Sequence, residues 1–117
     1  MNNDDIQTMF LHRFTALART RLANAREAAE KRDHDAVAVS VRELHGLAGE
    51  AGLLGFSEIV PLARAGEDKA KRLCAERTPE MAADLIDTLR LIEQRIEVLG
   101  TRSARGSGVV KLGDRPE

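Results

Sequence analysis

Apolar residues recur at helical spacing along most of the chain, and this pattern predicts an all-α fold. Side chains of an α-helix advance by about 100° per residue, so residues three, four or seven apart share one face. The strongest pattern begins with Thr78 as a cap and Pro79 at the first helical position, and it closes at Gly100. Its apolar face is formed by Met81, Leu85, Leu89, Ile92, Ile96 and Leu99.

The first segment, residues 4–32, contains no glycine or proline and permits one helix of about 27 residues. Asp4 or Asp5 can cap its start, because a carboxylate accepts hydrogen bonds from the first free amides. A break follows at residues 31–35, where Asp33 or Asp35 can cap the next helix. The apolar positions of the first segment are Ile6, Phe10, Phe14, Leu17, Leu22, Ala25 and Ala29.

Another helix is predicted after Ser57, its expected N-cap, with Pro61 at about the fourth helical position. Its apolar stripe is formed by Ile59, Leu62, Ala63, Gly66, Ala70 and Leu73, and a loop is expected at residues 75–77. With the helix that precedes Ser57, the chain then has four amphipathic helices joined by short loops. Such helices pack most simply as an antiparallel up-down four-helix bundle.

The helix before Ser57 carries His45, the candidate functional histidine, and we expect this helix to end near residues 52–55. Its core face is predicted to hold Val37, Ser40, Leu44, Leu47, Ala51 and Leu54. His45 lies about 120° from the centre of that face on a helical wheel. We therefore expect its ring at the edge of the bundle, in contact with water.

Three glycines, Gly46, Gly49 and Gly52, follow His45 within two turns. Each costs a helix interior roughly 0.5–1 kcal/mol relative to alanine, so their presence needs a reason. Close approach of a neighbouring helix would place them on the core face, but they fall mostly on the side of His45. Gly49, one turn after His45, leaves the ring open to a bulky partner. The pattern favours a functional, accessible histidine.

A longer pattern extends from this histidine into the next predicted helix. It is formed by His45, Leu47, Gly49, Leu54, Gly55, Ile59 and Glu67. This pattern resembles the signature of the histidine-containing phosphotransfer (HPt) domain family, and the resemblance covers roughly residues 5–99. It implies a four-helix bundle with an extra short N-terminal helix, or an N-terminal helix extension, bent near residues 15–18. The apolar pattern does not decide between one helix and two.

The chain departs from the family pattern at three positions. Leu44 stands before the histidine where the family has a small residue, and Gly66 stands before Glu67 where the family has leucine. Ala48 replaces the common lysine three residues after the histidine, which removes a cation from the expected phosphoryl site. Arg42, one turn before His45, is the obvious substitute. Arg64, on the following helix, is a second candidate.

The resemblance implies a phosphorelay protein that accepts and donates a phosphoryl group at His45. Its partners would be response-regulator receiver domains, which bring Mg²⁺ and an aspartate, and a hybrid histidine kinase. An exposed imidazole is substantially unprotonated near neutral pH, and its outer nitrogen Nε2 projects furthest from the helix. Leu53, Phe56 and Ile59 are expected to give the partner apolar contact. The alternative is a helical docking module that binds a receiver or kinase without accepting phosphate.

Other catalytic and binding sites find little support in the sequence. His12, His34 and Cys74 lack the spacing of metal ligands, and no glycine-rich loop follows a strand. We expect no metal, cofactor or nucleotide site, so any phosphoryl group on His45 must come from another protein.

Composition fits a single helical domain. The chain has 117 residues, 43 % of them hydrophobic, with no Trp or Tyr, and we assign residues 1–100 to the bundle and 101–117 to a C-terminal tail. A net charge of −1 gives no bulk attraction to nucleic acid or membrane, and no apolar run indicates a signal peptide or membrane span. One cysteine, Cys74, excludes an internal disulfide. We expect a cytoplasmic monomer.

Overall fold

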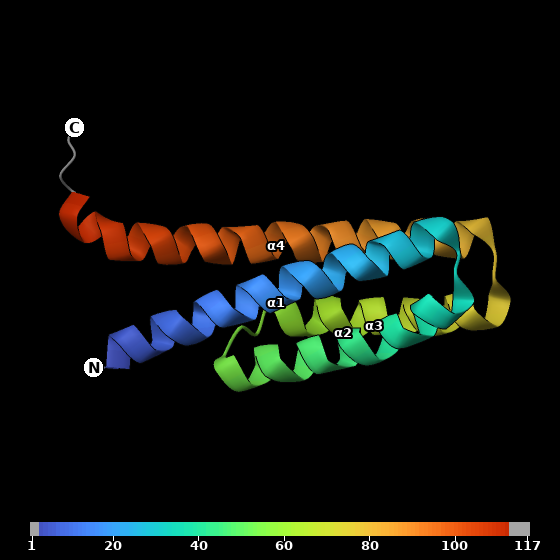
Figure 1. The fold of residues 1–117 in the computed structure, drawn as a ribbon, viewed down its shortest axis with the longest axis horizontal. Coiled ribbons are helices and arrows are strands. Elements are labelled where there is room, and N and C mark those ends of the chain that lie inside the picture. Colours follow the sequence, from blue (N-terminus) through green and yellow to red (C-terminus); the bar gives the residue numbers. More distant parts are fainter. Residues whose placement is uncertain (1–2, 113–117) are drawn as a thin grey trace.

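The computed structural model describes the backbone of residues 3–112 and the side chains of residues 5–101. The described chain consists of four helices and no strand: α1 (Asn3–Lys31), α2 (His34–Leu54), α3 (Ile59–Glu76) and α4 (Pro79–Leu112). Each helix packs against two others, in the order α1, α2, α3, α4 and back to α1. Successive helices run in opposite directions (Figure 1), so the predicted antiparallel up-down four-helix bundle is confirmed.

The first helix is a single continuous element, which decides the alternative that the sequence left open. α1 spans 29 residues without a break, so the N-terminal part is an extension of the helix and not a separate short helix. The start of α1 and the end of α4 reach beyond the turn that joins α2 to α3 (Figure 1). The N-terminal part of α1 therefore has fewer neighbours than the rest of the bundle.

Local capping chemistry explains both ends of α2 and the start of α4. The Asp33 carboxylate accepts a hydrogen bond from the Ala36 amide at 3.2 Å and caps α2. Gly55 ends α2 with φ +84°, a conformation that costs glycine little, and its amide reaches back to the last turn. The Thr78 hydroxyl accepts from the Met81 amide at 3.1 Å, which confirms the predicted start of α4.

Three predicted helix ends are wrong. α3 begins at Ile59, not directly after Ser57, and it continues through Glu76, so the loop is shorter than expected. α4 does not end at Gly100 but continues to Leu112 through the segment predicted as a linker. Gly100 by itself costs the helix about 1 kcal/mol, which is too little to end it at that residue. Residues 113–117 of the predicted tail lie outside the described residues.

The core draws on all four helices. Its largest fully buried side chains are Leu22, Val37, Leu44, Leu47, Ile59, Leu73, Leu85, Leu89, Ile92 and Ile96. The predicted core position Leu54 is wrong, since it is 37 % exposed at the open end of α2. Among the described helices, none combines the length and the apolar content that a membrane crossing requires.

Candidate functional site

His45 lies on the outer edge of α2, as its helical angle predicts. Its side chain is 78 % exposed, whereas Leu44 and Leu47 on either side of it are fully buried. The two leucines fix the rotation of α2 in the bundle, because burying them holds the histidine at the surface beside α3. The predicted exposure of the ring is confirmed.

Glu67 of α3 holds the inner nitrogen of this ring. The His45 Nδ1 atom lies 3.2 Å from one carboxylate oxygen of Glu67 and 3.3 Å from the other. An ionised carboxylate only accepts hydrogen bonds, so this geometry assigns the proton to Nδ1. The Nε2 atom of a neutral ring then carries the free electron pair. Glu67 itself is only 13 % exposed.

The sequence pattern included Glu67 but gave it no role, and the contact is a finding of the structure. The two residues are 22 positions apart, on helices that run antiparallel through the turn at residues 55–58. They lie about equally far from that turn, and residues so placed on an antiparallel helix pair come side by side. That symmetry is the signal from which the contact follows.

Lys71 forms an ion pair with the same carboxylate that contacts His45. The Nζ atom of Lys71, one helical turn after Glu67, lies 3.4 Å from Glu67 Oε2. That oxygen is also the one 3.2 Å from His45 Nδ1. Imidazole, carboxylate and ammonium therefore form a chain that runs from α2 onto α3.

Two arginines, one a turn before His45 on α2 and the other a turn before Glu67 on α3, are available to bind an anion. Arg42 and Arg64 are exposed, and neither forms a hydrogen bond or ion pair with another residue of the described range. Arg21 of α1, by contrast, is committed to two α2 carboxylates at 3.0 Å each, those of Glu43 and Glu50. Those two acids flank His45 in sequence, so Arg21 offsets part of the negative charge of this helix.

The three glycines of the site divide into two kinds. A Cβ atom at Gly49 would meet nothing within 4 Å, and one at Gly52 would meet only Val60 Cγ2 at 3.9 Å. Both glycines are exposed, so no side chain projects from the surface at these two positions. Neither glycine is required for a close contact between helices. Gly46 differs, because its Cβ would lie 3.7 Å from the guanidinium of Arg21 and therefore faces α1.

Two of the departures from the HPt pattern compensate for each other. Gly66 is buried, and a Cβ atom there would lie 3.5 Å from Leu44 Cδ1 and from Ile92 Cδ1. The large residue before the histidine thus fills the space that the missing side chain before Glu67 leaves. The large side chain is on α2 and the small residue on α3, the reverse of the family pattern, and the distance between the two helices is kept.

The third departure concerns the lysine position. Ala48 is only 4 % exposed and belongs to the core. A lysine at this position would have to extend its stem out of the core to bring its ammonium group to the surface. Position 48 therefore supplies no cation to the surface, and the exposed arginines nearby in sequence are Arg42 and Arg64.

The predicted docking residues lie in different surroundings. Leu53 is 89 % exposed, and Phe56 is half-buried with its ring 5.1 Å from that of Phe14. Ile59 is fully buried, so its predicted contact with a partner is wrong. Its place on the apolar stripe of α3 is the prediction that holds, because Ile59 packs into the core.

An apolar groove that the sequence did not predict adjoins Leu53. It has a volume of about 250 Å³ and lies between α1 and the end of α2. Its lining consists of Phe10, Arg13, Phe14, Leu17, Glu50, Leu53 and Leu54. Phe10 and Leu17 of α1 are 45 % and 42 % exposed, so the groove is open to solvent.

No group of three or more metal-ligating side chains is arranged around a common point within the described part of the chain. A search of curated proteins and a search of solved structures each found no significant match. A family model does match: the Hpt domain, over residues 9–100. This match covers most of α1, all of α2 and α3, and α4 up to Gly100, and it includes His45, Glu67 and the turn between them. The chain therefore belongs to the Hpt domain family, whose members carry out histidine phosphotransfer in phosphorelays.

Proposed function

We propose that this protein carries a phosphoryl group on Nε2 of His45 and exchanges it with the aspartates of receiver domains. The observation that carries the proposal is the state of the ring, with Nδ1 held by Glu67 and the rest of the side chain 78 % exposed. Exposure on an open face also distinguishes this function from that of a docking module, which needs no accessible imidazole. Hpt domains act with receivers and kinases, so a hybrid histidine kinase is the expected source of phosphate.

The transfer step follows from the arrangement of the ring. The Nε2 electron pair attacks the phosphorus of an aspartyl phosphate, a P–N bond forms, and the P–O bond to the aspartate breaks with its electrons on the carboxylate. The ring gains positive charge and keeps its proton on Nδ1. The Glu67 carboxylate, 3.2 Å away, stabilises that charge without having to move. No proton is lost in either direction, which suits a reversible carrier.

The phosphoryl group needs positive charge nearby, because it carries close to two negative charges at neutral pH. Arg42 lies one turn before His45 on α2, and Arg64 lies one turn before Glu67 on α3. Both are exposed and neither is engaged by another described residue. We assign Arg42 to screening the phosphoryl group and steering the acidic site of the receiver, with Arg64 as a second contributor.

The docking surface extends from His45 toward α1. A standard interface buries about 800 Å² per partner, which corresponds to a disc of about 16 Å radius. Leu53 is eight residues after His45 on the same helix, or about 12 Å along its axis. An interface centred on His45 therefore covers Gly49 and Leu53 and reaches the groove next to Phe10. Leu53 and Phe56 remain docking residues in this proposal.

The extent of the phosphotransfer unit is also a proposal. The family match ends at Gly100, although α4 continues to Leu112. This supports residues 1–100 as the phosphotransfer domain and residues 101–117 as an appended segment.

Phosphotransfer profiling tests the function. The full chain is incubated with a panel of receiver domains labelled on aspartate, and label is followed on the histidine protein over time. We expect rapid, acid-labile and base-stable labelling from at least one receiver, and none on His45→Gln. A fold control by circular dichroism is straightforward, since an exposed residue contributes little to packing. Equal labelling of His45→Gln would exclude His45 as the acceptor.

A further inference from the structure

The Glu67 carboxylate stabilises a positive ring, but it also lies close to the position of a negative phosphoryl group on His45. Phosphorylation places close to two negative charges on a ring whose other nitrogen already contacts the Glu67 carboxylate. Arg42 and Arg64 can screen the phosphoryl group, but neither forms an ion pair with Glu67. The cation that would otherwise stand at position 48 is replaced by a buried alanine.

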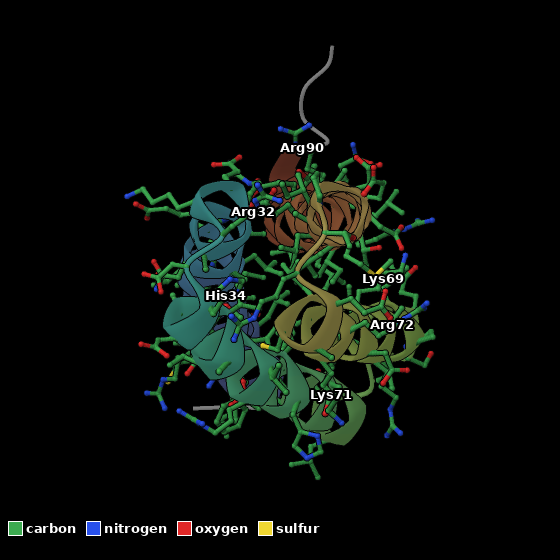
Figure 2. All side chains as sticks on the ribbon, turned by 90° about the vertical axis from the view of Figure 1, so that its right-hand side faces the viewer. Arg32, His34, Lys69, Lys71, Arg72 and Arg90 are labelled. Atoms are coloured by element: carbon green, nitrogen blue, oxygen red, sulfur yellow. The ribbon has the colours of Figure 1, made fainter. Side chains whose placement is uncertain are left out.

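Lys71 is the one cation within the described residues that forms an ion pair with Glu67. Its Nζ atom is 3.4 Å from Glu67 Oε2, and its side chain is 57 % exposed. Figure 2 shows Lys71 on the lower side of α3, close to α2, while Lys69 and Arg72 point away on the other side of the same helix. Lys69 is engaged elsewhere, with Asp84 and Thr88 of α4.

We propose that Lys71 is a positioning residue for phosphotransfer, which acts on His45 through Glu67. The inference rests on the proposed function of His45, and it adds a residue that the family pattern does not contain. Lys71 has two effects on the site. It fixes the carboxylate in the orientation that accepts from Nδ1, and it offsets the charge of Glu67 when the phosphoryl dianion arrives.

The orientation effect follows from the shared oxygen. Glu67 Oε2 lies within 3.4 Å of both Lys71 Nζ and His45 Nδ1. A glutamate has three rotatable bonds, and a second partner at one oxygen reduces the number of conformations that it samples. The carboxylate then stays at Nδ1, and the neutral ring keeps its free electron pair on Nε2, where transfer takes place.

The charge effect follows from the order of the groups. Along the chain from the phosphoryl group to α3 the charges alternate: the dianion, the ring that becomes positive, the carboxylate, and the ammonium. Without Lys71, no ammonium group offsets the repulsion between the carboxylate and the dianion on the two sides of the ring. The stability of phosphorylated His45 relative to the receiver's aspartyl phosphate should fall accordingly.

The test compares Lys71→Met with Lys71→Arg and with Arg72→Met in the full chain. Arg72 is a matched control, because it is the next residue of α3, is exposed, and forms no ion pair or hydrogen bond with other described residues. Two readouts are measured. One is the ¹⁵N spectrum of the unphosphorylated His45 ring, which reports which nitrogen carries the proton, and the other is the rate and equilibrium of phosphotransfer.

We expect Lys71→Met to lower the fraction of neutral His45 with its proton on Nδ1 and to reduce transfer about two- to fivefold, the range for an exposed ion pair. Lys71→Arg should restore both, and Arg72→Met should match the wild type. An unchanged ring spectrum in Lys71→Met, or an equal loss of transfer in Arg72→Met, would overturn the inference. These outcomes are separate from failure of the proposed function, in which the wild type itself takes no phosphate while the spectrum can still be compared.

Discussion

Leu44 is large and Gly66 small where the family has the reverse, and this predicts that substitutions at the two positions have strongly coupled effects on stability. A Cβ atom at Gly66 would already contact Leu44 Cδ1 and Ile92 Cδ1 at 3.5 Å, and all three residues are buried. Alanine therefore fits at this position, whereas the additional three carbons of leucine would overlap the side chains that surround it. Gly66→Leu should force α3 away from α2 unless Leu44 is made small at the same time.

The magnitudes are large enough to measure. Leu44→Ala removes a fully buried side chain and should cost about 2–5 kcal/mol. Gly66→Leu should cost about 1–3 kcal/mol by overpacking, partly offset by the better helix propensity of leucine. Acting independently, the two changes would remove roughly 3–8 kcal/mol, a large share of the ~5–15 kcal/mol that is typical of a domain. The double variant should instead recover at least about 2 kcal/mol of that loss.

Urea unfolding of the wild type, both single variants and the double variant gives this coupling energy directly. Gly66→Ala serves as the control, because its methyl group makes ordinary contacts and should be neutral or stabilising. Phosphotransfer by the double variant is a second readout, since restoring the distance between α2 and α3 should restore the contact of His45 with Glu67. Additive losses in the double variant would refute the reasoning, and would mean that the two departures from the family pattern are unrelated.

Other expected outcomes concern the open face, the free cation and a pH-dependent ion pair. Gly49→Leu should raise the free energy of unfolding by up to about 1 kcal/mol, since nothing lies within 4 Å of its Cβ, yet block transfer by steric exclusion. Full activity in this variant would disprove the role of Gly49 in access. Arg42→Ala should slow transfer several-fold at low salt and progressively less at high salt, and a rate equal to wild type at every salt concentration would remove Arg42 from the mechanism. Arg19, by hydrogen bonding and charge, lowers the pKa of Glu97 below its ordinary value, so this pair stabilises the fold above that value and ceases to do so as the pH falls through the lowered one. Thermal melts of the wild type and Glu97→Gln should therefore differ at neutral pH and converge in acid, and a gap that persists in acid would contradict this.

Features set by local chemistry could be predicted from the sequence. The caps at Asp33 and Thr78 and the glycine at position 55 act through hydrogen bonds and backbone preferences within a few residues, and all three are found. The exposure of His45 follows from its angle to the buried face of its own helix. The apolar stripe of α4 from Leu85 to Leu99 is likewise buried, because all its residues lie on the face of the helix that packs against the core.

Features that depend on neighbouring helices could not be predicted in the same way. Phe10 lies on the apolar face of α1 but is 45 % exposed, because its burial depends on how far the neighbouring helices extend and not on the pattern of α1 alone. The contacts of Glu67 with His45 and with Lys71 require both the turn and the side-chain directions. For the same reason Gly66 looks like an isolated defect in the sequence and a complement to Leu44 in the structure.

The most direct test of the central claim is to identify the nitrogen that carries the phosphoryl group. The full chain, labelled with ¹⁵N in histidine, is phosphorylated by an aspartyl-phosphate receiver and followed by ³¹P and ¹⁵N NMR. We predict a single P–N species on Nε2 of His45, with the proton retained on Nδ1 next to Glu67. Phosphate on Nδ1, phosphate on His12 or His34, or persistent labelling of His45→Gln would contradict the account.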